Sequence, residues 1–139
     1  MALERTLAMI KPDAVAAHLV GEIIRRAQAG GLHPVGIRML QLTTAEARAF
    51  YAVHRERPFY NDLVAFMTEG PIVAMLLEGE GAIQRWRDLM GATDPAEAAS
   101  GTIRADLGTS KERNATHGSD SPENAAIEAS FHFSELDLV

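Results

Sequence analysis

The chain has 139 residues, of which 47% are hydrophobic and 23% are charged, and its formal net charge is -6. This size and balance predict one globular domain over residues 1–139, with a hydrophobic core of its own. The acidic balance argues against a general nucleic-acid-binding protein. The absence of cysteine excludes disulfides, thiolate nucleophiles and cysteine-based zinc sites.

The first residues do not resemble a targeting or membrane segment. Charges at Glu4, Arg5 and Lys11 interrupt the apolar centre that an export signal needs. No apolar run approaches the roughly 18 residues of a membrane-spanning helix. We therefore expect a soluble cytoplasmic protein with neither a membrane nor a nucleic acid as its partner.

The N-terminal segment has the periodicity of a strand. Leu7 and Met9 alternate with their neighbours, which predicts a strand over 4–12. Pro12 removes the hydrogen-bond donor that would extend the ladder, so Lys11 is expected at the end of this strand.

A helix and a second strand are predicted next. Apolar residues from Val20 follow a helical stripe, and Gly30 and Gly31 are expected to stop that helix. Alternating apolar residues over 33–42 then predict a strand, with its apolar positions at Val35, Ile37 and Met39.

The middle of the chain predicts helix, helix, strand and helix. Thr43 and Glu46 have the spacing of a capping box before a helix over 45–54. Asn61 is expected to cap a short helix. The continuously apolar segment 71–77 predicts a strand buried on both faces, and a stripe of apolar residues predicts a helix whose inward positions are Ile83, Trp86 and Met90.

The last third begins with a long polar segment. Residues 92–113 show no periodicity and predict a loop, and loops of this length are usually functional. A short strand over 114–117 follows, and Ser121 and Pro122 then begin a helix. The resulting order contains a βαββαβ core. It predicts an α+β sandwich, with an antiparallel sheet and helices on one face.

One histidine has the surroundings of a nucleophile. His117 precedes Gly118, which allows a close turn of the backbone, and lies just before a helix whose N-terminus favours anions. Glu128 is two turns along that helix, where it can hold one imidazole nitrogen and leave the other free. Ser119 could complete the bridge between them. The simpler interpretation is an ordinary surface histidine.

A nucleophilic histidine suggests phosphoryl transfer, which needs positive charge around the moving group. The candidate cations are Lys11, Arg87 and Arg104, and the candidate hydroxyl donor is Thr93. A base could stack on the ring of Phe59. Tyr51 and His54, one helical turn apart, could share one patch. Each has an alternative as a solvated charge, a turn residue or a core ring. The sequence has no Walker GxxxxGK[ST], GxGxxG, GxSxG or HExxH motif, so any nucleotide must be held without a P-loop.

The stretch "NATHGSDS" resembles the Asn-x-x-His-Gly-Ser-Asp signature of nucleoside diphosphate kinases. Five further stretches stand in the order of that family, namely "ERTLAMIKPDAV", "FYAVHRERPFY", "GPIVAMLLEGE", "RDLMGATDPAEA" and "GTIRADL". The resemblance covers nearly the whole chain and is to the short bacterial branch.

This resemblance implies a ping-pong kinase in which His117 takes the γ-phosphoryl group of a nucleoside triphosphate, typically ATP, and passes it to a nucleoside diphosphate. Magnesium would bridge the nucleotide's phosphates, without an all-protein metal site. The implied catalytic residues are His117, Glu128, Ser119, Lys11 and Tyr51. The implied nucleotide-binding residues are Lys11, His54, Phe59, Leu63, Arg87, Thr93, Arg104 and Asn114.

The family also implies what each group does. Lys11 would contact the phosphate and the sugar 3'-hydroxyl, and Asn114 would hold ribose hydroxyls. Phosphates would bind to Arg87, Thr93 and Arg104, whereas Phe59 would stack on the base with Leu63 beside it. Glu128, assisted by Ser119, would hold the non-nucleophilic ring nitrogen.

The implied fold is a ferredoxin-like sandwich with a four-stranded antiparallel sheet flanked by helices. The implied assembly is a homo-oligomer built from dimers, which extends to tetramers or hexamers. The chain departs from the family at a helix entry and in its last helix, at positions expected to affect stability or assembly rather than chemistry, namely Ala17, His18, Ala129, Ser130 and His132.

Two other classes of protein share parts of this pattern. A regulatory module on the same sandwich would bind a small molecule without turnover, and it would have no reason to hold Glu128 near His117. A phosphorelay carrier would receive phosphate from another protein, and it would need neither a base platform nor the phosphate clamp of Arg87 and Arg104.

Overall fold

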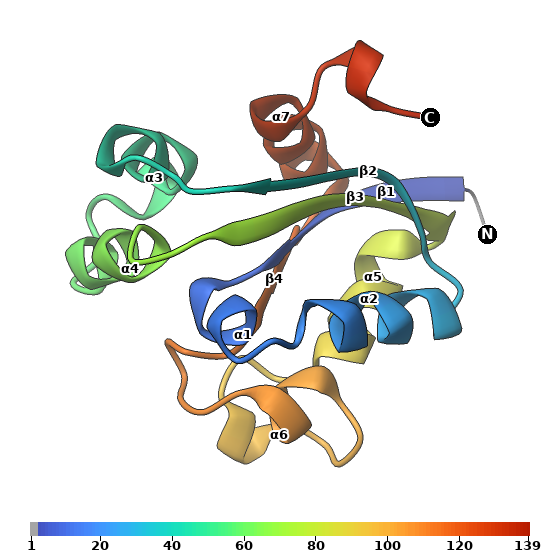
Figure 1. The fold of residues 1–139 in the computed structure, drawn as a ribbon, viewed down its shortest axis with the longest axis horizontal. Helices are drawn as coiled ribbons and strands as arrows, with labels where there is room; N and C mark the ends of the chain where they lie inside the picture. The colour runs from blue at the N-terminus through green and yellow to red at the C-terminus, as the bar shows by residue number, and fades with distance from the viewer. Residues whose placement is uncertain (1–2) are drawn as a thin grey trace.

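The architecture is centred on a four-stranded antiparallel sheet of order β2-β3-β1-β4 (Figure 1). The computed structural model describes residues 3–139. Its strands are β1 (Leu3–Ile10), β2 (His33–Leu40), β3 (Ile72–Glu80) and β4 (Thr116–Gly118). This strand order confirms the predicted α+β sandwich of the ferredoxin-like type.

Within residues 3–139, seven α-helices and three short 3-10 turns connect and flank the strands. The helices are α1 (Pro12–Ala16), α2 (Val20–Ala29), α3 (Thr44–Phe50), α4 (Tyr60–Met67), α5 (Ala82–Met90), α6 (Ile103–Leu107) and α7 (Pro122–His132). The 3-10 turns are η1 (Ala52–His54), η2 (Pro95–Glu97) and η3 (Glu135–Asp137). No helix among residues 3–139 is long and apolar enough to cross a membrane.

Helices cover both faces of the sheet, so the expectation that they lie on one face was wrong. Alternate residues of β1 and β3 point into two separate cores. One core lies against α2 and α5, and the other lies against α3, α4 and α7. In Figure 1, α7 lies on the opposite side of the sheet from α2 and α5. The reason is visible in β1 and β3 themselves, which are apolar at successive positions and therefore need cover on both faces.

The predicted alternation in β2 is interrupted by a bulge. Pro34 pairs with Leu77 and Gly36 pairs with Leu76, which leaves Val35 as an extra residue. Val35 therefore lies in the core of α7, whereas Ile37 and Met39 are 51% and 62% exposed on this edge strand.

Several predicted boundaries hold and others shift. The capping box of Thr43 and Glu46 is present in both directions, with hydrogen bonds of 2.9 and 3.1 Å. Asn61 does not cap α4, which begins one residue earlier, at Tyr60. The predicted loop 92–113 contains η2 and α6, because Asp94 and Thr102 each cap a following turn with their side chains.

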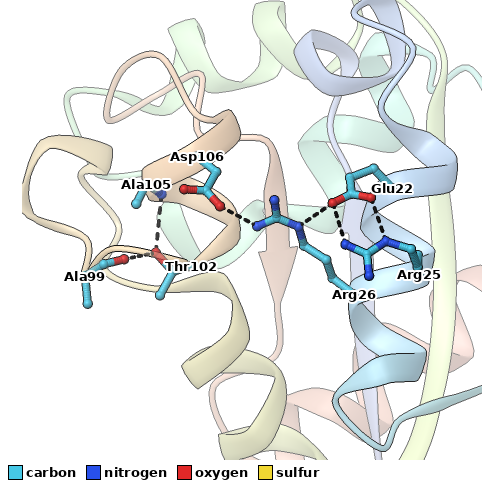
Figure 2. A network of polar contacts seen from close by, with 7 residues as sticks. All are labelled: Glu22, Arg25, Arg26, Ala99, Thr102, Ala105 and Asp106. Carbon is cyan, nitrogen blue, oxygen red and sulfur yellow. Dashed lines mark hydrogen bonds and ion pairs between the residues drawn. The ribbon is translucent and has the colours of Figure 1, made fainter.

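A chain of ion pairs joins α2 to α6 (Figure 2). The guanidinium of Arg26 contacts Glu22 through Nε and Asp106 through an Nη atom, each at 2.8 Å. Thr102 accepts a hydrogen bond from the Ala105 N–H at 3.3 Å and donates one to the Ala99 carbonyl at 2.7 Å. These contacts hold the short helix that carries Arg104.

Four of the five positions that are expected to depart from the family lie in three different environments. His18 has a left-handed φ of 64°. His132 is buried in the interior, where its Nε2 has no hydrogen-bond partner within residues 3–139. Ala129 and Ser130 line a hollow of about 460 Å³ between α7 and the C-terminal turn.

Candidate active site

His117 is held from behind by the helix that follows it. It lies in β4, paired with Met9 of β1, and its Nε2 is 3.0 Å from Oε1 of Glu128 on α7. Ser119 donates to the same carboxylate oxygen at 2.9 Å, and its Oγ also accepts the Leu7 N–H at 3.2 Å. Ser119 thus ties Glu128 to the sheet.

This arrangement fixes the chemistry of the imidazole ring. A carboxylate that accepts from Nε2–H leaves Nδ1 as the nitrogen with the lone pair. Nδ1 of His117 has no hydrogen-bond partner in the part of the chain that the structure describes, and His117 lines a pocket. The ring is therefore oriented to act as a nucleophile through Nδ1.

The pocket in front of His117 has a volume of about 580 Å³. Nine predicted site residues line it, namely Lys11, Tyr51, His54, Phe59, Leu63, Thr93, Arg104, Asn114 and His117. Ser119 and Glu128 lie behind the histidine. Arg87 does not line the pocket, although its charge lies close enough to Arg104 to lower the pKa of that residue.

The inner end of the pocket is cationic. Lys11 and Arg104 are each only 8% exposed. Burial, together with the charge of Arg104, lowers the pKa of Lys11 to about 8. Burial and then the charge of Arg87 lower the pKa of Arg104 to about 10. Positive charge held in a poorly solvated place is stabilised by an incoming anion, so this end suits phosphate.

Hydrogen bonds position these polar groups before any ligand arrives. Lys11 Nζ donates to Asn114 Oδ1 at 2.8 Å, and Asn114 Nδ2 donates to the Thr93 carbonyl at 2.9 Å. Arg104 donates to the carbonyls of Gly91 and Thr116 at 3.0 and 2.8 Å. Its buried Nε has no partner within residues 3–139, and the guanidinium keeps further N–H donors beyond the two that bond to Gly91 and Thr116.

Tyr51 offers a second unpaired polar atom. The ring is buried and its hydroxyl has no partner among the described residues. Burial raises the pKa of Tyr51, and the Glu128 carboxylate raises it further, so the phenol stays protonated. The O–H is therefore an unpaired donor. The centroid of the Tyr51 ring lies 6.2 Å from the centroid of the His117 ring.

Aromatic rings lead from His117 to the mouth of the pocket. Tyr51 and His54 stack with centroids 6.5 Å apart, and His54 and Phe59 lie 5.5 Å apart. Phe59 is 47% exposed, and Leu63 lines the pocket close to it in the chain. A flat ring with one accessible face is suited to stacking on a nucleobase.

Three lining residues were missed from the sequence, namely Asp62, Lys111 and Glu112. Asp62 stands between Phe59 and Leu63 on the same helical turn, and this proximity could have indicated it. Lys111 and Glu112 reach the pocket only because the segment around α6 folds back over it. No sequence pattern around them signals that return.

No cluster of three or more histidine, aspartate or glutamate side chains in residues 3–139 has the geometry to hold a metal ion. The pocket does contain Asp62 and Glu112 beside its cations. This donor set fits a magnesium ion that enters with nucleotide phosphates, because Mg²⁺ keeps several waters and uses few protein carboxylates.

Comparisons with known proteins agree with these features. The family model described as "Nucleoside diphosphate kinase" matches residues 4–138. Proteins named nucleoside diphosphate kinase from Nitrosospira multiformis and Bordetella pertussis are 58% and 56% identical over 138 residues, covering 99% of this chain and 98% of each relative.

Solved structures give the same result. An Aquifex aeolicus nucleoside diphosphate kinase superposes with a TM-score of 0.98 at 48% identity, covering 99% of this chain and 100% of that one. A Halobacterium salinarum nucleoside diphosphate kinase in complex with CDP gives a TM-score of 0.95 at 41% identity, covering 99% of this chain and 92% of that one.

Proposed function

We propose that this chain, which belongs to the nucleoside diphosphate kinase family and transfers phosphoryl groups between nucleotides, carries the phosphoryl group on Nδ1 of His117. The observation that supports this assignment most directly is the bond of 3.0 Å between His117 Nε2 and Glu128. This hydrogen bond leaves Nδ1 of His117 without a partner within the described residues. His117 lies on the wall of a pocket that has a cationic end. The family supplies the reaction, and the geometry suggests the residues.

In the first half-reaction, Nδ1 attacks the γ-phosphorus of a nucleoside triphosphate. The N–P bond forms as the bond from phosphorus to the β,γ-bridging oxygen breaks, and a nucleoside diphosphate leaves. Glu128 stabilises the positive charge that develops on the imidazole ring. In the second half-reaction, a β-phosphate oxygen of another diphosphate attacks the same phosphorus, and the N–P bond breaks.

The pocket suggests how both nucleotides bind in one orientation. The base would stack on Phe59 beside Leu63, which favours no particular base because every base has a π-face. Asn114 and Lys11 would bind the sugar hydroxyls. The CDP bound by the Halobacterium salinarum relative supports a nucleoside diphosphate in this pocket.

The phosphates would lie at the inner end. Arg104 would bind them through guanidinium N–H groups that are still unpaired, and Arg87, Thr93 and Lys11 would complete the clamp. The Tyr51 hydroxyl and His54 would contact the phosphate near His117. These groups are already ordered, so little reorganisation is needed as charge develops in the transition state.

We also propose Mg²⁺ as the ion that accompanies the nucleotide. When bound with the nucleotide, it would supply neutralisation of the charge that develops on the leaving group. Among the residues of this chain, Asp62 and Glu112 are the carboxylates on the pocket wall. We propose a cytoplasmic location, which is supported by the supply of nucleoside triphosphates and diphosphates there.

A homo-oligomer based on dimers, and extending to tetramers or hexamers, is proposed as the working form. The supporting feature is the edge strand β2, where Ile37 and Met39 are largely exposed. An edge strand with apolar side chains is a ready surface for pairing with a second copy. Light scattering that shows only monomer at micromolar concentration would contradict this.

The direct test of the function is the intact mass after a brief incubation with ATP and magnesium, measured under alkaline conditions that preserve phosphohistidine. We expect a gain of one phosphate, which is lost when GDP is added. His117→Gln should abolish the gain while nucleotide binding persists. His33→Gln, which changes an exposed histidine on β2, is the matched control and should behave like the unmodified chain.

The alternatives predict other outcomes in the same experiment. A regulatory binding module would bind ATP and gain no phosphate. A phosphorelay carrier would gain phosphate from a phosphoprotein and not from ATP. Transfer from ATP that persists in His117→Gln would remove His117 as the nucleophile.

A further inference from the structure

The backbone turns sharply just before His117. Ala115 has a φ of 73°, in the left-handed region that residues other than glycine rarely adopt. The Thr116 N–H donates to the Asn114 carbonyl at 2.9 Å, so Ala115 is the centre of a γ-turn. Turns of this hand are rare and strained, and they persist only where neighbouring groups hold them.

The junction of β1 and α1 holds both polar atoms of Ala115. The Lys11 N–H donates to the Ala115 carbonyl at 2.8 Å. The Ala115 N–H donates to Oδ2 of Asp13 at 3.1 Å. Asp13 is thus the one charged side chain that bonds directly to the strained residue within the described part of the chain.

This turn determines how the pocket groups face one another. Asn114 precedes it and His117 follows it by two residues, and both side chains line the pocket. Lys11, from the same junction as Asp13, donates its Nζ to Asn114 at 2.8 Å. A change at Ala115 would therefore alter the distance between the group that binds the nucleotide and the group that attacks it.

We propose that Asp13 is a positioning residue for phosphoryl transfer: its carboxylate holds the Ala115 turn and, through it, the relative placement of Asn114 and His117. The proposal rests on the function proposed for His117. Asp13 acts through the backbone of Ala115 and has no role in contacting the nucleotide.

The charge of Asp13 has a second effect on the pocket. The groups whose charges act on Lys11 are Arg104 on α6, Asp13 on α1 and Glu112 beside the pocket. Burial and Arg104 lower the pKa of Lys11, whereas Asp13 and Glu112 raise it. Asp13 therefore helps to keep Lys11 charged, in addition to holding the turn.

Two substitutions separate these effects. Asp13→Ala removes the acceptor and the charge, whereas Asp13→Asn keeps an acceptor oxygen and removes only the charge. The readouts are the single-turnover rate of His117 phosphorylation at saturating ATP and the pH dependence of ADP binding. Asp88→Ala, at an exposed carboxylate on α5, is the control and should match the unmodified chain in both.

For Asp13→Ala we expect the phosphorylation rate to fall about a hundredfold, the loss that a displacement of about 1 Å causes at a reacting centre. Asp13→Asn should lose much less rate, but its alkaline loss of ADP binding should begin at a lower pH. Ala115→Gly added to Asp13→Ala should restore part of the rate, because glycine adopts the turn without strain.

The outcomes distinguish this proposal from the function on which it rests. If the unmodified chain gains no phosphate from ATP, the function assigned to His117 fails. If it does, and Asp13→Ala transfers normally per folded molecule, the positioning role of Asp13 is wrong. A lower melting temperature with an unchanged rate and pH dependence would also overturn it. Should Asp13→Ala not fold, Asp13→Glu, which keeps the charge but misplaces the acceptor, takes its place, and a normal phosphorylation rate in it would overturn the positioning role. Asp13→Asn with an unshifted pH dependence would overturn the charge effect on Lys11.

Discussion

Trp86 donates its indole N–H to the main-chain carbonyl oxygen of His117 at 3.1 Å, from inside the core. Its ring also occupies the space next to Gly118, where an added Cβ would lie 2.5 Å from Trp86 Cδ1 and 2.7 Å from Met90 Cε. The strand that carries His117 is thus packed directly onto the only tryptophan.

This contact predicts that Gly118→Ala destabilises the chain. The new methyl group must displace a buried ring, and overpacking of a core typically costs about 1 to 3 kcal/mol. Urea unfolding followed by circular dichroism gives the free energy. Gly21→Ala is the matched control, because a Cβ there meets nothing within 4 Å. It should be neutral or stabilise α2 by up to about 1 kcal/mol. Equal effects of the two substitutions would contradict the packing argument.

His18→Gly is expected to stabilise the fold. His18 has a φ of 64° just before α2, a conformation that costs an L-residue about 1 to 2 kcal/mol. Glycine adopts this conformation freely, but it also raises the entropy of the unfolded chain. The free energy of unfolding should therefore rise by about 0.5 to 1 kcal/mol. Thermal unfolding measures it, and no rise in melting temperature would show that the His18 conformation is unstrained.

The sequence predicted those parts of the site that depend on local spacing. Glu128 was placed near His117 because both belong to one strand–turn–helix segment, and Lys11 was placed at a strand end because Pro12 follows it. Trp86 could not be connected to His117, which is 31 residues away, because a core position predicts burial and not a particular hydrogen-bond partner.

The segment around α6 was harder to predict for a different reason. Five residues from Ile103 to Leu107 are too few to establish a helical period, although Thr102 is an ordinary capping residue. Lys111 and Glu112 therefore remained unassigned. The bulge at Val35 was missed similarly, because a single inserted residue leaves no trace in an alternating pattern.

Arg26→Ala is expected to loosen α6, whereas Arg25→Ala is not. Arg26 bonds to Glu22 on its own helix and to Asp106 on α6, while Arg25, among the described residues, bonds only to Glu22. The free energy of unfolding should fall by about 1 kcal/mol in Arg26→Ala. Exposed ion pairs contribute little, and the partly buried aliphatic part of Arg26 adds packing. Hydrogen exchange of the α6 amides is the sharper readout. Protection should fall in Arg26→Ala alone, and equal protection in both variants would contradict the bridge.

His132 predicts a loss of stability in mild acid. Burial, aided by the Arg38 charge, lowers the pKa of His132 from 6.5 to about 4. Between these values the unfolded chain binds the proton and the folded chain does not, so stability is complete above pH 6.5 and declines toward pH 4. Over this pH range, the free energy of unfolding should fall by about 3 kcal/mol because of His132.

His132→Phe should remove that contribution, because it replaces an unpaired buried nitrogen with an apolar ring. Urea unfolding of both chains from pH 4.5 to 7.5 gives the difference in slope. Parallel curves would show that His132 takes up its proton in the folded state.

Lys11 predicts two effects of alkaline pH with opposite signs. Its pKa of about 8 in the free protein means that the ammonium is present below pH 8 and is lost above it. Binding of ADP, which needs that charge, should weaken by up to about tenfold per pH unit above 8, and binding there should take up a proton.

The stability of the fold should depend on pH in the opposite direction. Between pH 8 and 10.5 the unfolded chain binds more protons than the folded one, so this group makes the free protein more stable as pH rises. Calorimetry of ADP binding and urea unfolding over the same pH range should therefore diverge. Lys11→Arg should lose the alkaline decline in binding, since arginine keeps its charge. If affinity and stability fell together, general alkaline unfolding would explain both, and the buried lysine would not be the cause.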